Sequence, residues 1–174
     1  SYESLNFMNS KKLITRIKGG LGNQLFCYAA AKRLAIVNDA ELVIDNVSGF
    51  LYDKNFQRTY QLDHFSISDR KANLDERFEP FSRLRRFFWQ RFSEHQPIEK
   101  KRYIIQRGVS FDPEILSLKL QNGTTYFDGF AQSENYFSDI EEIIKSTFKI
   151  TAPIDIINQS LINEVMTSNN PIAV

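Results

Sequence analysis

Apolar residues occur along the chain in short runs that alternate with amphipathic segments. Residues 13–17 form a β-rich run that ends at three glycines, and residues 25–37 carry apolar side chains at helical spacing. Residues 41–45 (ELVID) are almost continuously apolar, which is typical of a parallel strand covered on both faces. This order predicts that the chain opens with a βαβ unit, which is right-handed on general grounds.

The alternation continues beyond an irregular polar and aromatic stretch at 48–75. We expect a helix over 81–92, a strand over 101–106, a short helix at SFDPEI, and a strand over 124–127. Further helices are expected over 133–148 and from Pro153 to Met166, and IAV at 172–174 begins another strand. The first of these helices carries its apolar residues on one face: Tyr136, Phe137, Ile140, Ile143, Ile144 and Phe148. Together these elements predict an α/β fold with a mostly parallel sheet and helices on both faces.

Composition narrows the class of protein. The chain has 174 residues, of which 42% are hydrophobic, so one globular domain with a sizeable core is expected. A net charge of +1 gives no overall attraction to nucleic acid, and we expect no nucleic-acid partner. The single Cys27 cannot form an internal disulfide and is interpreted as a small buried residue of a cytoplasmic protein. No signal peptide opens the chain; Met8 is the expected natural start, with Ser1 to Phe7 derived from a vector.

The segment FSRLRRFFWQRF mixes arginines with aromatic residues. The favoured interpretation is a helix that buries Phe81, Leu84, Phe88 and Phe92 while its arginines stay in water. The alternative is peripheral contact of Phe81 to Phe92 with a membrane surface. His64 and His95 have no second ligand or nucleophile at a useful spacing, and both are expected at the surface or in satisfied core positions.

Three glycines, Gly19, Gly20 and Gly22, lie between the first strand and the first helix, where they form either a tight packing turn or a ligand site. A dinucleotide fingerprint fits only in part, because Leu25 stands where a small residue is needed, although Asp45 suits the ribose-binding acid. A phosphate-binding Walker loop fits poorly, because Asn23 and Gln24 replace its Lys-Ser/Thr pair.

Two strings resemble the α-1,2-fucosyltransferase family. GGLGNQLFCYAAAKRLA is similar to the opening of those enzymes, and YFDGFAQSENYFSDIEEIIKSTF is similar to their aromatic-rich segment and the helix after it. The departures are Cys27, where glutamine is usual, and Ala131, which widens the spacing between Phe130 and Gln132. The second string matches at Gly129, Phe130, Gln132, Ser133, Glu134, Tyr136 and Phe137.

The resemblance implies that residues 8–174 form the amino-terminal Rossmann-like domain of a GT-B enzyme, truncated before its carboxy-terminal donor-binding domain. Such an enzyme transfers L-fucose from GDP-fucose to the 2-hydroxyl of a galactose-type acceptor, with inversion. The implied substrate-binding residues are Gly19, Gly20, Gly22, Asn23, Gln24, Gln132 and Ser133.

The resemblance also implies that part of the active site is missing from this sequence. The family's H-x-R-R-G-D-Y motif, associated with the donor diphosphate, does not occur in it. We expect that motif and the catalytic residues beyond Val174, in continuation of the strand that begins at IAV. The chain alone should therefore fold without transferring fucose.

A further expectation, an alternative role for one segment and two alternative functions accompany this interpretation. No Asp-x-Asp sequence is present, which favours a metal-independent reaction, and no other cofactor is expected. For the segment from Gln132 to Glu134, a helix cap centred on Ser133 competes with substrate binding. The alternative functions are a non-catalytic nucleotide- or glycan-binding module and half of an NAD-dependent oxidoreductase.

Overall fold

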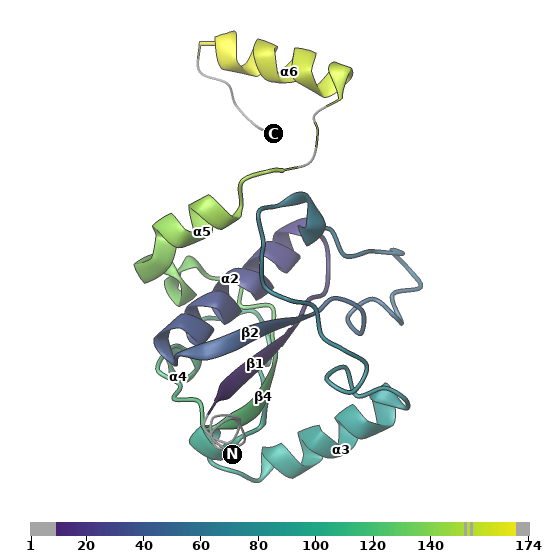
Figure 1. The fold of residues 1–174 in the computed structure, drawn as a ribbon, viewed down its shortest axis with the longest axis vertical. Helices are drawn as coiled ribbons and strands as arrows, with labels where there is room; N and C mark the ends of the chain where they lie inside the picture. Colours follow the sequence, from purple (N-terminus) through teal and green to yellow (C-terminus); the bar gives the residue numbers. More distant parts are fainter. Residues whose placement is uncertain (1–9, 152, 154, 170–174) are drawn as a thin grey trace, which may run out of the picture.

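The computed structural model describes residues 10–151, 153 and 155–169. Its centre is a four-stranded parallel sheet in the order β2-β1-β4-β3 (Figure 1). The parallel sheet confirms the predicted α/β class, and the first two strands lie within a residue or two of their expected positions. The strands are β1 (Lys11–Arg16), β2 (Ala40–Asp45), β3 (Tyr103–Ile105) and β4 (Gly123–Asp128).

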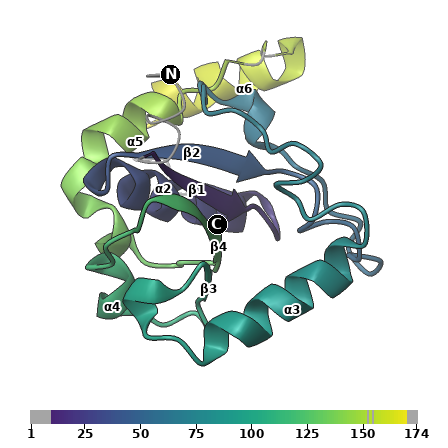
Figure 2. The same cartoon turned by 60° about the horizontal axis from the view of Figure 1, so that its bottom comes forward.

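The described part of the chain has five helices, and Figure 2 shows α2 and α3 on different sides of the sheet. They are α2 (Leu21–Val37), α3 (Ser82–Glu94), α4 (Pro113–Leu116), α5 (Glu141–Thr147) and α6 (Ile156–Thr167). Four short 3-10 turns connect them: η1 (Leu62–His64), η2 (Ile98–Lys100), η3 (Glu134–Tyr136) and η4 (Ser138–Ile140).

Both faces of the sheet are buried. On one face, Leu13, Leu42 and Phe127 pack with the buried side of α2. On the other face, Ile14 and Val43 form a smaller cluster with buried Tyr103, Tyr126 and Ala72. Alternate residues of each strand therefore pack into the apolar clusters on opposite faces of the sheet. This explains why the strands are continuously apolar in the sequence.

The helix expected over 133–148 is wrong in extent, because η3 and η4 precede the short α5. Ser133 caps η3, and Phe137 leaves helical geometry with φ −145° while its ring packs 5.9 Å from that of Phe26. The buried Tyr136 hydroxyl accepts hydrogen bonds from the Asp112 amide at 2.6 Å and the Gln106 side chain at 3.1 Å. Tyr136 and Phe137 are thus held by separate contacts, and these contacts interrupt the single helix that was expected.

The predicted burial of four apolar residues in α3 and at its N-cap is also wrong. Phe81 is 77% exposed, Leu84 56%, Phe88 61% and Phe92 64%. The helix instead turns a polar stripe of Ser82, Arg86 and Ser93 toward the sheet.

The reason is that this polar stripe satisfies buried polar groups of the sheet. The Arg86 guanidinium reaches Tyr126, and Ser93 Oγ accepts the backbone N–H of Tyr103 at 3.1 Å. Tyr103 belongs to β3, which is one of the two edge strands of the described sheet. Unpaired polar groups there would be costly, so these bonds fix which face of α3 turns inward.

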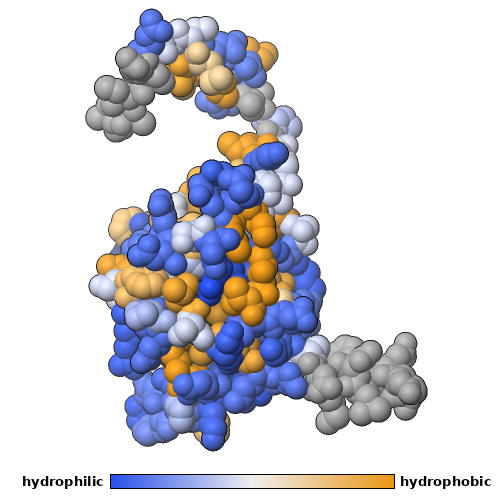
Figure 3. Space-filling model, turned by 90° about the vertical axis from the view of Figure 1, so that its left-hand side faces the viewer, coloured by the Kyte–Doolittle hydropathy of each residue, from blue (hydrophilic) through white to orange (hydrophobic). Residues whose placement is uncertain are grey.

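Helix α6 follows the body of the molecule and lies beyond α5 (Figure 1). Figure 3 shows apolar side chains both on the body and on α6, where Ile156 and Met166 are exposed. In the described residues, no helix is both long and apolar enough to cross a membrane.

Two expectations fall outside the described residues. One is the suggested vector segment, 1–7, and the other is the strand expected at 172–174, which reaches Val174. The placement of the diphosphate-binding motif and the catalytic residues beyond Val174 depends on that strand and stays a prediction.

Candidate functional site

The glycine loop joins the end of β1 to the start of α2, at the carboxyl edge of the sheet. Helix α2 begins four residues earlier than expected, so Gly22, Asn23 and Gln24 belong to its first turn. Gly20 is the N-cap, where no side chain caps the helix, and the first turn contains no acidic residue. The amides at this end therefore present the positive end of the helix dipole without a side-chain acceptor.

Of the three positions, only Gly19 has a backbone conformation that favours glycine. Gly19 has φ +81°, and a Cβ there would lie 2.8 Å from Asn23 Nδ2 and 3.2 Å from Phe130 Cε1. A Cβ at Gly20 or Gly22 would meet nothing within 4 Å. Of the two interpretations of Gly22, a tight packing turn is wrong, because Gly22 lies in the first turn of a helix with open space beside it. A ligand site at Gly22 stays a prediction.

Gly19→Ala should lower the free energy of unfolding by about 1–3 kcal/mol, because alanine disfavours the left-handed backbone and meets Asn23. Gly22→Ala is the matched control and should be neutral or raise stability by up to about 1 kcal/mol, since alanine is the better helix former. Urea unfolding monitored by circular dichroism measures both. Equal destabilisation by the two variants would contradict this assignment of the loop.

Asn23 and Gln132 meet beside this loop. Gln132 Nε2 donates a hydrogen bond to Asn23 Oδ1, although the residues are 109 positions apart. Asn23 is half-buried and Gln132 is exposed. Within the described residues, Asn23 Nδ2 and Gln132 Oε1 have no hydrogen-bond partner, so the pair retains a donor and an acceptor for a ligand.

Gln24 and Ser133 have structural roles. Gln24 is fully buried; its Nε2 donates to the carbonyls of Gly19 and Thr59, both at 2.9 Å, and its Oε1 accepts the Gln61 amide at 2.9 Å. This leaves Gln24 to position the loop rather than to contact a ligand. Ser133 Oγ accepts the Asn135 amide at 3.3 Å, so the predicted cap exists, on a 3-10 turn.

Asp128 ends β4 and gathers two cations next to the loop. Its carboxylate accepts Arg16 Nη1 at 3.0 Å, Lys18 Nζ at 2.6 Å and the Tyr103 hydroxyl at 2.9 Å. Asp128 is only 4% exposed. Burial opposes its ionisation, but the charges of Arg16 and Lys18 outweigh burial and hold the pKa of Asp128 below its ordinary value. The group is therefore a fixed carboxylate.

Asp45 forms a second, fully buried centre at the end of β2. It accepts the Ser48 amide at 2.9 Å, Arg86 Nη2 at 3.3 Å and the Tyr126 hydroxyl. Burial and the Asp45 charge raise the pKa of Tyr126, which stays a neutral hydroxyl donor. Asp45 is thus enclosed by its partners and is not presented to a ribose.

The sequence interpretation did not identify Arg16, Lys18, Arg86 and Asp128 as parts of this region. Lys18 also lies over the Phe130 ring, 4.5 Å from its centroid, and so links the glycine loop to the segment after β4. A usable signal was present, because Arg16 and Asp128 are the last residues of two neighbouring parallel strands. Parallel strands bring their carboxyl ends to one edge of the sheet, where ligands of α/β proteins usually bind.

Other candidate residues take no part in this region. Cys27 is fully buried and its thiol donates to the Gly129 carbonyl at 3.2 Å; burial raises its pKa to about 11, which confirms an unreactive core residue. His64 and His95 are exposed, as expected for surface histidines. Among the residues that the structure describes, no three histidine, cysteine or acidic side chains are grouped to hold a metal ion.

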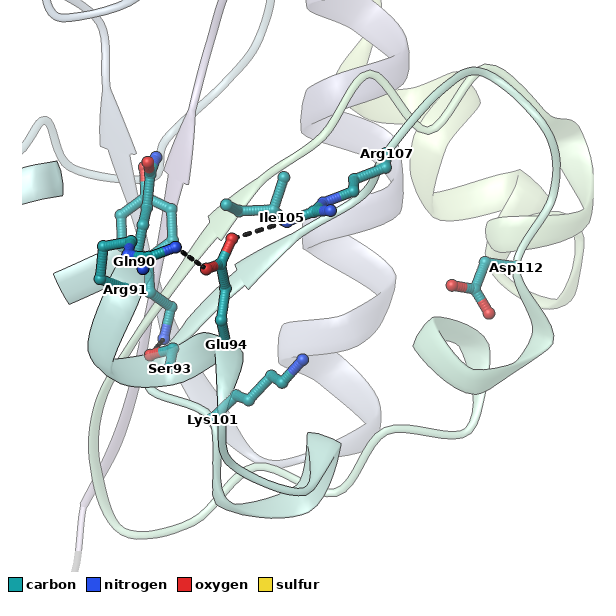
Figure 4. Close-up of a pocket in the computed structure, with 9 residues that line it drawn as sticks. Gln90, Arg91, Ser93, Glu94, Lys101, Ile105, Arg107 and Asp112 are labelled. Carbon is teal, nitrogen blue, oxygen red and sulfur yellow. Dashed lines mark hydrogen bonds and ion pairs between the residues drawn. The ribbon is translucent and has the colours of Figure 1, made fainter. Parts of the chain in front are cut away.

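A separate open pocket of about 710 Å³ lies between α3 and β3. Figure 4 shows Glu94 between Arg91 and Arg107, which it contacts at 3.2 and 2.6 Å. Lys101 and Asp112 lie at its margin. Glu94 therefore forms ion pairs with both of these arginines within the pocket. None of the residues that line the pocket belongs to the glycine loop.

No family model matches the chain, and no curated protein or solved structure is significantly similar to it.

Proposed function

We propose that this chain forms the amino-terminal, Rossmann-like half of a GT-B α-1,2-fucosyltransferase. The reaction would move L-fucose from GDP-fucose to the 2-hydroxyl of a galactose-type acceptor, with inversion. The hydrogen bond between Asn23 and Gln132 is the observation that carries the proposal. It joins the two strings that resemble the family, at the edge of the sheet where a substrate cleft is expected in α/β folds.

The uncapped first turn of α2 suits the departing diphosphate. Its backbone amides and the nearby Lys18 ammonium would offset negative charge that develops on GDP, while Asn23 and Gln132 bind sugar hydroxyls. Asp128 is a poor candidate for the base that deprotonates the acceptor, because a carboxylate with a lowered pKa and two cationic partners holds a proton weakly. The proposed reaction uses neither a metal nor another cofactor, in keeping with the lack of Asp-x-Asp.

Two other functions explain the site less well. Half of an NAD-dependent oxidoreductase would need an accessible acid at the end of β2, where Asp45 is fully buried. A non-catalytic nucleotide- or glycan-binding module would use the same loop and stays the principal alternative.

The proposal includes a cytoplasmic location and peripheral contact with an anionic membrane. Helix α3 presents Phe81, Leu84, Phe88 and Phe92 outward. At the helical angle of 100° per residue, Arg85 and Arg91 lie on opposite sides of this apolar stripe. An apolar stripe with arginines along both margins is typical of helices that lie in the lipid headgroup region.

The ligand class is tested by saturation-transfer NMR of the 174-residue chain with GDP-fucose, lactose and NAD, each at millimolar concentration. We expect GDP-fucose and lactose to receive saturation and NAD to receive none. Affinities should be about millimolar, because the family's diphosphate-binding motif is not in this sequence. Tight NAD binding without a response from the other two ligands would overturn the proposal.

A further inference from the structure

Arg16 also lines a second pocket, which contains no residue of the glycine loop. It has a volume of about 440 Å³ and lies between the end of β1, the segment after β2 and α3. Pockets of this size accommodate one or two sugar units. Three of its lining residues are arginines and none is acidic: the lining consists of Arg16, Tyr52, Arg83, Arg86, Phe87 and Gln90.

Two of these arginines are held in place from behind. Arg16 Nη2 donates to the Ser48 carbonyl at 2.9 Å and Arg16 Nη1 to Asp128 at 3.0 Å. Arg86 Nη2 donates to Ser48 Oγ at 2.9 Å and to Asp45 at 3.3 Å. Because these side chains are already ordered, a ligand would meet them without the entropic cost of fixing them.

Arg86 also has unused hydrogen-bonding capacity. The residue is 7% exposed, and within the described residues its buried Nε–H has no hydrogen-bond partner. That nitrogen is enclosed, so a ligand in the pocket does not reach it. Within the described residues Arg86 Nη1 forms no hydrogen bond and is not one of the buried unpaired atoms, so Nη1 is the donor left for a ligand oxyanion.

The charge balance around the pocket favours an anion. Arg16, Lys18, Arg83 and Arg86 are opposed by two carboxylates, Asp45 and Asp128, which leaves a net charge of +2. Arg83 is exposed and forms no ion pair among the described residues; its guanidinium lies 5.8 Å from the centre of the Tyr52 ring.

We propose that this pocket binds an acidic sugar unit, one that carries a carboxylate or phosphate group. Arg83 and Arg86 would hold the oxyanion, the rings of Tyr52 and Phe87 would cover the apolar face of the pyranose, and the Gln90 amide would bind a hydroxyl. That this sugar belongs to the acceptor glycan rests on the proposed function, whereas the binding of acidic sugars does not.

The test is an NMR titration of the chain with glucuronic acid, glucose 6-phosphate, glucose and inorganic phosphate, read at the Gln90 side-chain amide. We expect at least one of the two acidic sugars to bind about tenfold or more tightly than glucose, and more tightly than inorganic phosphate. The stronger acidic sugar identifies the group as carboxylate or phosphate. Glucose or inorganic phosphate binding as tightly as the stronger of the two acidic sugars overturns the proposal.

Two arginine variants of α3 complete the test. Arg83→Gln should weaken the acidic sugar about tenfold without changing the melting temperature, because Arg83 is exposed and outside any ion pair of the described residues. Arg91→Gln lies on the same helix but outside this pocket, and it should leave binding unchanged. Equal effects of the two substitutions, or none from Arg83→Gln, would refute the site.

The same spectra separate this inference from the proposed function. The Asn23 side-chain amide reports the response of the glycine loop to GDP-fucose and to lactose, and the Gln90 amide reports the acidic sugar. A response at Gln90 alone retains the acidic-sugar site and removes the fucosyltransferase proposal. A response at Asn23 alone removes only the acidic-sugar site.

Discussion

Asp128→Asn should lower the free energy of unfolding by about 3 kcal/mol, the largest loss of stability that we expect from a single polar substitution in this chain. The substitution removes a buried negative charge that Arg16 and Lys18 contact at 3.0 and 2.6 Å. Their side chains are mostly buried, so solvent compensates them only in part. Urea unfolding gives the value directly.

Asp63→Asn is the matched control. Asp63 contacts Lys71 at the same 2.6 Å, but both of these side chains are well exposed. Solvent screens such a pair, and its loss should cost at most about 1 kcal/mol. Equal effects of Asp63→Asn and Asp128→Asn would contradict the account of Asp128 as a buried centre of charge.

The same centre gives a pH dependence with a defined sign. The folded-state pKa of Asp128 lies below its ordinary value of 3.8, so its contribution to stability is fully present above pH 3.8 and is lost as the pH falls through the lower folded value. The Asp128→Asn variant should therefore lose less stability than the wild type on acidification. An unchanged acid limb in the variant would show that Asp128 is not the responsible group.

Phe88→Glu should abolish most binding of the chain to vesicles that contain phosphatidylglycerol. Phe88 lies on the outward stripe of α3 and is 61% exposed, so the glutamate costs little folding energy but places a charge in the lipid interface. Burying one phenylalanine contributes about 1.5–3 kcal/mol, which corresponds to a loss of affinity of about tenfold or more. Vesicle co-sedimentation measures it.

Phe56→Glu is the control, because Phe56 is similarly exposed but lies in the loop before η1. The Phe56→Glu variant should bind the vesicles as tightly as the unchanged chain. Binding of the unchanged chain should weaken when salt is added and when the vesicles contain phosphatidylcholine alone. Binding that does not depend on Phe88 would mean that α3 faces a different partner, such as a second protein.

The parallel sheet was predictable because its signal is local. Runs such as ELVID are apolar at every position but the ends, and only a strand covered on both faces uses all of them. The glycines likewise marked the junction of β1 and α2, although they did not indicate that α2 begins at Leu21. The position of the helix start depends on which glycine takes the left-handed backbone, and only Gly19 does so in this loop.

The orientation of α3 was not predictable from its own pattern. A helix with one aromatic and one polar face normally buries the aromatic face, which would leave Arg86 in solvent. The opposite result arises from Asp45 and Tyr126, which lie in strands far along the chain and need the Arg86 guanidinium. Gln24 shows the same limit, since its partners Thr59 and Gln61 come from an irregular segment without a periodic signal.

The most direct test of the central claim is a titration of ¹⁵N-labelled chain with GDP-fucose and with lactose, observed at the side-chain amides of Asn23 and Gln132. Their hydrogen bond makes the two amides parts of one site. The proposal predicts that both amides shift together with at least one of these ligands, and that Asn23→Ala weakens its binding about tenfold while the melting temperature stays unchanged. No shift of this pair with either fucosylation substrate, or shifts with NAD alone when NAD is titrated in parallel, would contradict the assignment of this chain to fucosyl transfer.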